Sequence, residues 1–371
     1  MKKRIISFIG IISLSIMTLT GCSSASSDKP KEPNGVNEGQ QSSEPSKDSE
    51  DTALNGSDKY LTTNGGAAIR YASLEHLGED TNLPEVFYTS EITPEALIQI
   101  YEALNWTPSG KVAVKLSTGE PPASNYLDPD LIKDLVSLVD GTIVECNTAY
   151  GGSRSSTAMH YQVAEDHGFT DIADFQILDE DGSMSIPVSD GTRLSEDLVG
   201  EAFDDYDSYL VLSHFKGHGM AGYGGAIKNI SIGLGSKEGK AWIHSGGKSR
   251  TNMWGGNQDA FLEAMGDAGK AVSDYLGNGE RIVYISVMNR LSIDCDCDGN
   301  PAEPDMHDIG ILASTDPVAL DQACLDLIWE SEGNESFIDR VNDRNGLHTL
   351  ENAEAIGLGS RRFRLTDIGQ Q

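Results

Sequence analysis

Apolar residues follow two spacings along the chain from about residue 94 onward. Short runs that are apolar at almost every position, such as Tyr-Leu-Val-Leu-Ser at 209–213, are typical of strands buried on both faces of a sheet. Between these runs, apolar residues three or four positions apart predict amphipathic helices. Three of the predicted helices begin at a Thr-Pro or Asp-Pro pair, as helix N-termini often do.

Strand-like and helix-like segments alternate, which indicates an α/β fold with a largely parallel or mixed sheet flanked by helices. In such sheets, ligands bind beyond the carboxyl ends of the strands. We expect strands over 111–116, 142–145, 174–178, 209–213, 281–287, 309–313 and 362–365. We expect helices over 94–104, 129–139, 155–167, 258–276, 317–329, 335–341 and 350–356.

The first 21 residues have the layout of a bacterial secretory signal. Three cations at 2–4 precede an apolar run over 5–19, which is shorter than the roughly 20 residues that a membrane-spanning helix needs. The run ends in Leu-Thr-Gly-Cys, which resembles a lipobox. We therefore expect a lipoprotein signal peptide at 1–21 and a lipid anchor on Cys22, at the extracytoplasmic face of a bacterial cell membrane. An uncleaved anchor, or an ordinary signal with a chance cysteine, is the alternative.

Composition divides the remaining chain in two. Residues 22–58 contain almost no apolar side chains, so after the lipidated cysteine we expect a disordered linker. Residues 59–371 are the predicted α/β body, of one or two lobes. The whole chain has 27 basic and 58 acidic residues, a net charge of −31. This charge argues against a nucleic-acid partner, because phosphate binding needs clustered cations.

Two loops after predicted strands carry most of the candidate chemistry. The first contains His-Phe-Lys-Gly-His-Gly, beginning at His214. Its glycines favour a loop, which is able to direct the rings of His214 and His218 to one point. Histidine is the commonest metal ligand in proteins. A pair of histidines bonded to backbone carbonyls in a structural turn is the alternative.

The second loop contains Asp-Cys-Asp-Cys-Asp. In an extended segment, Cys295 and Cys297 point the same way and suit one metal ion. Neighbouring carboxylates disfavour a thiolate unless a cation is near, so a metal site or a Cys295–Cys297 disulfide explains the pair better than a nucleophile does. With His214 and His218, the cysteines make a ligand set suited to zinc or iron. Asp308 is expected as a further ligand or as a partner of one.

The order of several segments resembles a bacterial and archaeal family catalogued as domain of unknown function 362. The resemblance covers about residues 111–356 and rests on segments 214–218, 224–229, 239–245, 295–297 and 308–321. Many members carry an inserted ferredoxin-like module, whereas this chain passes directly from Ser245 to the helix expected at 258. The four-cysteine runs of iron–sulfur sites are also missing from its sequence, so we do not expect such a cluster. The resemblance supports the fold and implies no reaction.

Three classes of function are compatible with these features. The one we favour is a metal-binding protein or enzyme, redox-active in one version, because thiols beside carboxylates need a compensating cation. Here Lys216, Lys228 and Asn229 would orient an anionic small molecule, and His244 would complete the polar site. The second is a lipid-anchored solute-binding protein without metal. The third is a structural module stapled by a Cys295–Cys297 disulfide.

Overall fold

The computed structural model describes residues 59–369. The signal peptide, the lipidated Cys22 and the linker predicted for 1–58 lie outside these residues. Within 59–369, no helix is long and apolar enough to cross a membrane.

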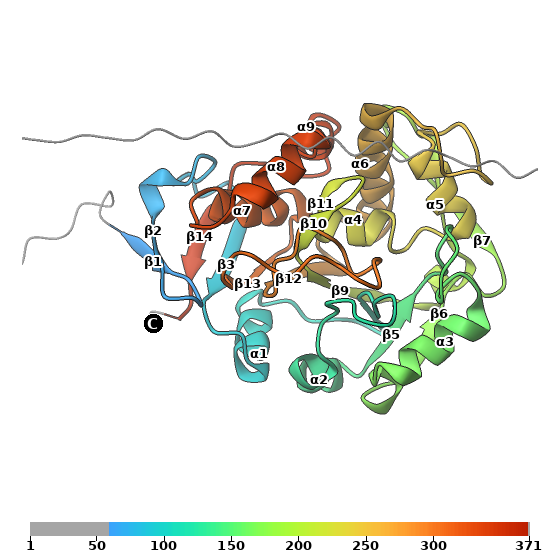
Figure 1. Ribbon diagram of the computed structural model, residues 1–371, viewed down its shortest axis with the longest axis horizontal. Coiled ribbons are helices and arrows are strands. Elements are labelled where there is room, and N and C mark those ends of the chain that lie inside the picture. The colour runs from blue at the N-terminus through green and yellow to red at the C-terminus, as the bar shows by residue number, and fades with distance from the viewer. Residues whose placement is uncertain (1–58, 370–371) are drawn as a thin grey trace, which may run out of the picture. The chain divides into compact units, whose positions relative to one another are not determined.

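An eight-stranded mixed sheet forms the centre of the described part (Figure 1). The strand order is β14 (Arg364–Asp367), β3 (Glu85–Thr89), β13 (Gly310–Ser314), β12 (Ile282–Met288), β9 (Ser208–His214), β4 (Val112–Lys115), β5 (Gly141–Glu145) and β6 (Phe175–Ile177). The five strands from β12 to β6 are parallel to one another, and β14 is parallel to β3. Strand β13 is antiparallel to both of its neighbours. The expected α/β class with a mixed sheet is confirmed.

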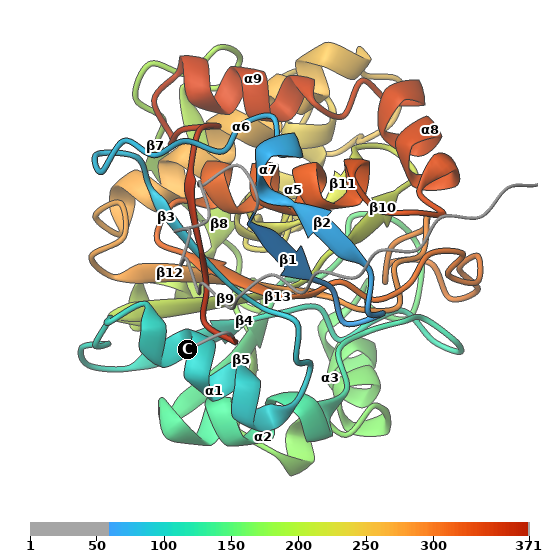
Figure 2. The same cartoon turned by 90° about the vertical axis from the view of Figure 1, so that its left-hand side faces the viewer.

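Helices cover both faces of the sheet, because alternate strand residues point to opposite sides. In β9, Leu210 and Leu212 pack in one core while Tyr209 and Val211 pack in the other. The first core is covered by α1 (Pro94–Ala103), α2 (Pro129–Leu138) and α3 (Thr157–Asp166). The second is covered by α4 (Ala226–Ser231), α5 (Lys237–His244), α6 (Gln258–Tyr275), α7 (Pro317–Trp329), α8 (Glu335–Asp343) and α9 (His348–Ala355). Figure 2 shows α1 and α2 on one side of the sheet and α7 and α9 on the other.

The predicted strands and long helices lie within a few residues of their expected positions. Strand β3 and the short helices α4 and α5 were not expected. The glycine-rich segment after His214 was expected to be a loop, and this was wrong: β10 (Lys216–His218) pairs with β11 (Gly222–Gly224) in a hairpin. Two further pairs are β1 (Tyr60–Thr62) with β2 (Ala68–Arg70), and β7 (Ser183–Pro187) with β8 (Glu196–Gly200).

Four parallel strands, β5, β4, β9 and β12, bring their carboxyl ends to one edge of the sheet. Lys115, Glu145 and His214 are the last residues of three of them. The segment that carries Cys295 and Cys297 follows the fourth. Both candidate loops therefore leave the same edge, as the rule for ligand sites in open α/β sheets predicts.

Candidate functional site

A cavity of about 450 Å³ lies beyond this edge. Its wall combines the ends of β4, β5 and β9 with the β10–β11 hairpin, parts of α4 and α5, and the segment around Cys295. The lining cations are Lys115, Arg154, Lys216, Lys228 and Lys240. Trp254, whose side chain is largely exposed, also contributes to the wall.

The hairpin is held tightly against the cysteine-bearing segment. The backbone N–H of Gly217 donates to the carbonyl of Ser292 at 2.8 Å. A Cβ at Gly217 would lie only 2.3 Å from the backbone oxygen of Ile293, so this close approach needs a glycine. As a result, the next residue, His218, lies beside Cys297.

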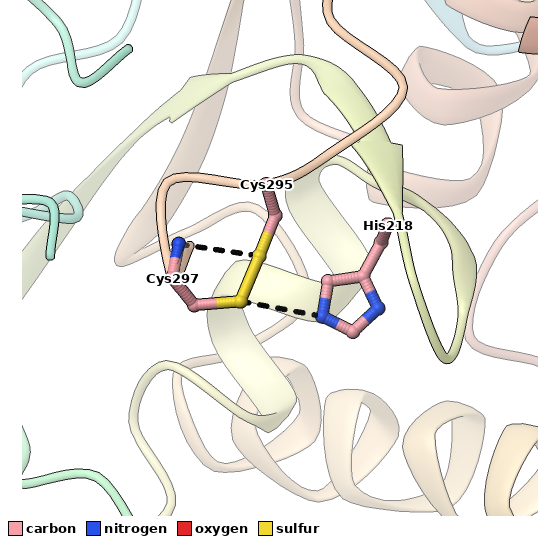
Figure 3. A group of neighbouring side chains, drawn as sticks. All are labelled: His218, Cys295 and Cys297. Atoms are coloured by element: carbon pink, nitrogen blue, oxygen red, sulfur yellow. Dashed lines mark hydrogen bonds between the residues drawn. A yellow bond between two sulfur atoms is a disulfide. The ribbon is translucent and has the colours of Figure 1, made fainter. Parts of the chain in front are cut away.

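Figure 3 shows His218 directed at the sulfur of Cys297, with 3.8 Å between Nε2 and Sγ. The other ring nitrogen, Nδ1, accepts from the backbone N–H groups of Met220 at 3.1 Å and Ala221 at 2.9 Å. Because Nδ1 is an acceptor, the neutral ring carries its proton on Nε2. Burial and then the nearby charge of Lys228 hold the pKa of His218 well below its usual range. The ring is therefore neutral and offers its Nε2–H to the sulfur.

Cys295 and Cys297 form a disulfide, one of the two states that the sequence left open. The backbone N–H of Cys297 donates to Sγ of Cys295 at 3.2 Å. Both cysteines line the cavity, but Cys295 is only 4% exposed, whereas Cys297 is half-buried. The ligand atoms of His218 and the two cysteines all lie within 4.8 Å of one another. The two candidate loops thus meet through these three residues.

Asp296, between the two cysteines, anchors their segment. Its carboxylate pairs with Nζ of Lys216 at 2.7 Å and with Nδ1 of His214 at 2.9 Å. Burial alone would raise the pKa of Asp296, but these two cationic partners hold it well below its usual range. Contrary to what the sequence had suggested, Asp296 therefore does not oppose a thiolate, because Lys216 and His214 neutralise its charge.

The structure does not assemble the predicted ligand set of two histidines and two cysteines. Nε2 of His214 contacts the carbonyl of Asn289 at 2.7 Å, and Nδ1 contacts Asp296. Both partners are acceptors, so both ring nitrogens donate and neither has a lone pair for a metal. Asp308 is also outside the group, since its carboxylate accepts from the backbone N–H of Arg290 at 2.7 Å. These partners are distant in sequence, which is why the pattern did not reveal them.

The remaining three side chains do not fit zinc or iron in this state. The thiolate is the form of cysteine that binds metals, and here the two sulfurs are bonded to each other. Coordination through Nε2 of His218 would require its proton to move to Nδ1, where two backbone N–H groups already donate. Zinc or iron binding would therefore need both reduction of the disulfide and rearrangement of the ring's hydrogen bonds.

The four residues predicted to bind substrate, Lys216, Lys228, Asn229 and His244, all line the cavity. Asn229 is engaged within the protein: its Oδ1 accepts from Nζ of Lys115 at 3.0 Å, and its Nδ2 donates to a serine hydroxyl at 3.0 Å. Lys216 is paired with Asp296. Among residues 59–369, Nζ of Lys228 has no hydrogen-bond or ion-pair partner. His244 uses Nδ1 for the carbonyl of Lys240 at 2.6 Å.

Sequence reasoning missed a buried ionic cluster in the same wall. Lys115 and Arg154 are 1% and 3% exposed, and both approach Glu145, at 3.9 Å and 3.5 Å respectively. Arg154 also contacts Glu120 at 3.3 Å. One signal was available: Lys115 and Glu145 each stand at the carboxyl end of an apolar strand, where a charged side chain has to find a buried partner.

Two solved structures are distantly similar to this chain. The lactate racemase apoprotein from Thermoanaerobacterium thermosaccharolyticum matches with 10% identity and a TM-score of 0.34, over 62% of this chain and 55% of that one. A structural-genomics protein from Thermotoga maritima matches with 10% identity and a TM-score of 0.36, over 71% of this chain and 58% of that one. This chain therefore spans little more than half the length of either protein. Likeness of this degree carries no argument about function.

No curated protein matches this chain significantly. The family model described as a domain of unknown function (DUF362) matches residues 112–326, more than half of the chain. The match includes the hairpin with His218, the cysteine pair and most of the cavity wall. The protein belongs to the family of the domain of unknown function DUF362.

Proposed function

We propose that this protein is a thiol–disulfide redox protein in which Cys295 and Cys297 exchange two electrons with a small molecule in the cavity. The observation that carries the proposal is the 3.8 Å contact between Nε2 of His218 and Sγ of Cys297. An N–H directed at sulfur stabilises the thiolate that forms when a disulfide opens. The cavity beside Cys297 supplies access for a reaction partner, which a purely structural disulfide does not need.

The exposures of the two cysteine residues assign their roles. In the reduced protein, the thiolate of half-buried Cys297 attacks a disulfide RSSR, forms a mixed disulfide and releases RS⁻. The thiolate of buried Cys295 then attacks Sγ of Cys297, closes the protein disulfide and releases a second RS⁻. Two electrons pass from protein to substrate, and the reverse sequence reduces the pair. The backbone N–H on Sγ of Cys295 stabilises the buried thiolate.

The proposed setting is the extracytoplasmic face of a bacterial cell membrane, reached by a lipid anchor on Cys22. The lipobox-like Leu-Thr-Gly-Cys and the polar residues 22–58 support an anchor with a linker. Oxidising compartments outside the cytoplasm are where disulfides form and persist. The net charge of −31 supports a small-molecule partner rather than a nucleic acid.

Replacing His218 with Asn tests the contact that carries the proposal. The Asn carbonyl is placed to accept from the backbone N–H groups of Met220 and Ala221, and the Nε2–H is lost. In the reduced full-length protein, we expect alkylation of Cys297 by iodoacetamide at pH 7 to slow about tenfold, since a hydrogen bond to a charged group contributes about 1.5–3 kcal/mol. Peptide mass spectrometry after timed quenching measures this rate.

The buried thiols Cys146 and Cys324 serve as internal controls and should stay unlabelled in both proteins. A control variant, Lys133→Gln, changes an exposed lysine and should leave the alkylation rate unchanged. An unaltered rate in His218→Asn would remove the basis of the proposal, because the imidazole would then have no influence on the thiolate.

Metal binding by the reduced protein is the second candidate function. The observation in its favour is the 4.8 Å grouping of His218, Cys295 and Cys297. Our proposal expects the reduced protein to show no stoichiometric zinc binding that depends on His218, because Nδ1 of that ring is occupied by two N–H donors. Stoichiometric zinc that is lost in His218→Asn would favour the second candidate.

A further inference from the structure

Among residues 59–369, one ammonium of the cavity wall has neither a hydrogen bond nor an ion pair. Lys115 and Arg154 share Glu145, Lys216 pairs with Asp296, and Lys240 donates to the carbonyl of Gly235 at 2.6 Å. Lys228 has no such partner among the described residues, although it lines the cavity. Burial and the neighbouring Lys216 lower the pKa of Lys228 to about 7. An anionic ligand would supply the missing partner and hold the ammonium in its charged form.

The same wall holds an imidazole acceptor. Nδ1 of His244 lies 2.6 Å from the carbonyl of Lys240, which only accepts, so the proton is on Nδ1 and Nε2 is unprotonated in the neutral ring. Burial, together with Lys228 and Lys240, lowers the pKa of His244 to about 4. The ring stacks on Phe261 at 4.7 Å between centroids, and Nε2 has no partner among residues 59–369.

His218 and His244 therefore have opposite tautomers, each set by backbone groups. His218 presents an N–H and His244 presents a lone pair. All three side chains line the cavity, Lys228 and His244 both lower the pKa of His218, and Nε2 of His218 contacts Sγ of Cys297. A ligand that bridges these groups must carry an anionic group for Lys228 and a hydrogen-bond donor for His244.

Resting on the proposed redox function, we infer that the cavity selects small thiols that carry an anionic group. The carboxylate of such a thiol pairs with Lys228, and its S–H donates to Nε2 of His244, beside the half-buried sulfur of Cys297. As the ligand's sulfur attacks Sγ of Cys297, its proton moves to Nε2 of His244 and the Cys295 thiolate leaves; the proton then passes from the imidazole to that thiolate. A second thiolate then attacks the mixed disulfide, so that 2 RSH and the protein disulfide give RSSR and two cysteine thiols.

The overall charge of the chain makes this selectivity testable. The field of the whole chain and the local charge of Lys228 predict opposite orders of reaction rate for anionic and cationic thiols. A net charge of −31 repels anionic thiols and attracts cationic ones. Charge focused by a cavity raises association rates by about 10–10³-fold. If Lys228 governs access, an anionic thiol should react faster than a cationic one, even though the net charge of the whole molecule repels it.

The experiment measures reduction of the oxidised full-length protein, in detergent, by mercaptoacetate, 2-mercaptoethanol and cysteamine. Each rate is divided by the rate of the same thiol with bis(2-hydroxyethyl) disulfide, which corrects for intrinsic nucleophilicity and thiolate fraction. We expect the corrected rate for mercaptoacetate to exceed that for cysteamine by about tenfold or more. Thiols on Cys295 and Cys297 are quantified by alkylation and mass spectrometry.

Three variants separate the contributions. Lys228→Gln should reverse the order, so that cysteamine becomes the fastest reductant. Lys133→Gln removes the same charge from an exposed lysine in α2, paired with Asp130 at 2.8 Å, and should keep the wild-type order. His244→Asn keeps an amide donor for the carbonyl of Lys240 but removes the Nε2 acceptor, so it should slow all three thiols by a similar factor.

The outcomes distinguish this inference from the function on which it rests. A pair that none of the three thiols reduces would overturn the proposed redox function. A pair that is reduced fastest by cysteamine in the wild-type protein would overturn the selectivity and leave the redox function standing. If Lys228→Gln does not fold, Lys228→Arg replaces it, and this charge-preserving variant should retain the preference for mercaptoacetate.

Discussion

Changing Cys295 to Ser should trap a mixed disulfide on Cys297, whereas changing Cys297 to Ser should leave the protein almost unmodified. The difference follows from exposure: Cys297 is half-buried at the cavity and touches His218, while Cys295 is 4% exposed. Without Cys295, no neighbouring thiolate is placed to attack Sγ of Cys297 and release the bound thiol. The intermediate of the exchange then becomes its end product.

The test treats both reduced variants with bis(2-hydroxyethyl) disulfide and follows the mass of the intact protein. Cys295→Ser should gain one mercaptoethanol group nearly completely, and Cys297→Ser should gain it at least about a hundredfold more slowly, because disulfide exchange needs an accessible thiolate. Cys146 and Cys324 are buried in both variants and report background modification. Equal modification of the two variants would contradict the assigned roles of nucleophile and resolving cysteine.

Of the variants proposed for this site, Asp296→Asn should lose the most stability. Its free energy of unfolding should fall by about 3–5 kcal/mol. The carboxylate is 2% exposed and holds the buried cations Lys216 and His214. Removing its charge leaves both cations without a compensating anion in the interior. Urea unfolding of the variant and the wild type measures the difference.

A neighbouring ion pair provides the matched control. Asp294 pairs with Arg340 at 2.9 Å, with a side chain that is 25% exposed, so Asp294→Asn should cost about 1 kcal/mol or less. In the double variant Asp296→Asn with Lys216→Met, part of the loss should return, because one unpaired cation is gone. A loss below about 1 kcal/mol in Asp296→Asn would show that this pair does not anchor the cysteine segment.

The direction of the pH dependence follows from the lowered pKa of Asp296. A carboxyl whose pKa is lower in the folded state stabilises the protein above its unfolded pKa, near about 3.9, and loses this contribution as the pH falls. The wild type and Asp296→Asn should therefore approach each other in stability only below about pH 4.

Local patterns predicted most of the main sheet, and the reason is visible in β9 and β12, whose seven residues each are all buried. Runs with so many consecutive apolar residues have few alternatives to a central strand. Strand β3 was missed because its pattern is mixed and its position depends on β13 and β14, far along the chain. The β10–β11 hairpin was missed because the glycine-rich segment suggested a loop, whereas Gly217 packs closely against the backbone of Ile293.

The positions of the strand ends predicted which loops would meet at the site, but not the partners of each side chain. The convergence of His218 with Cys295 and Cys297 followed from two loops leaving one sheet edge. The hydrogen bonds of His214 could not be predicted in this way, because its partners Asn289 and Asp296 lie 75 and 82 residues away in the sequence. The Cys-x-Cys spacing also could not distinguish a disulfide from a metal site, because two cysteines on one side of an extended segment are compatible with either.

The reduction potential of the Cys295–Cys297 pair tests the central claim most directly. The full-length protein is equilibrated anaerobically with thiol–disulfide buffers, quenched by alkylation and quantified by mass spectrometry. Stabilisation of Cys297 by His218 and of Cys295 by a backbone N–H should make the potential less negative than about −300 mV, within the range of proteins that exchange disulfides. A value below about −300 mV would identify a structural disulfide and contradict the redox function.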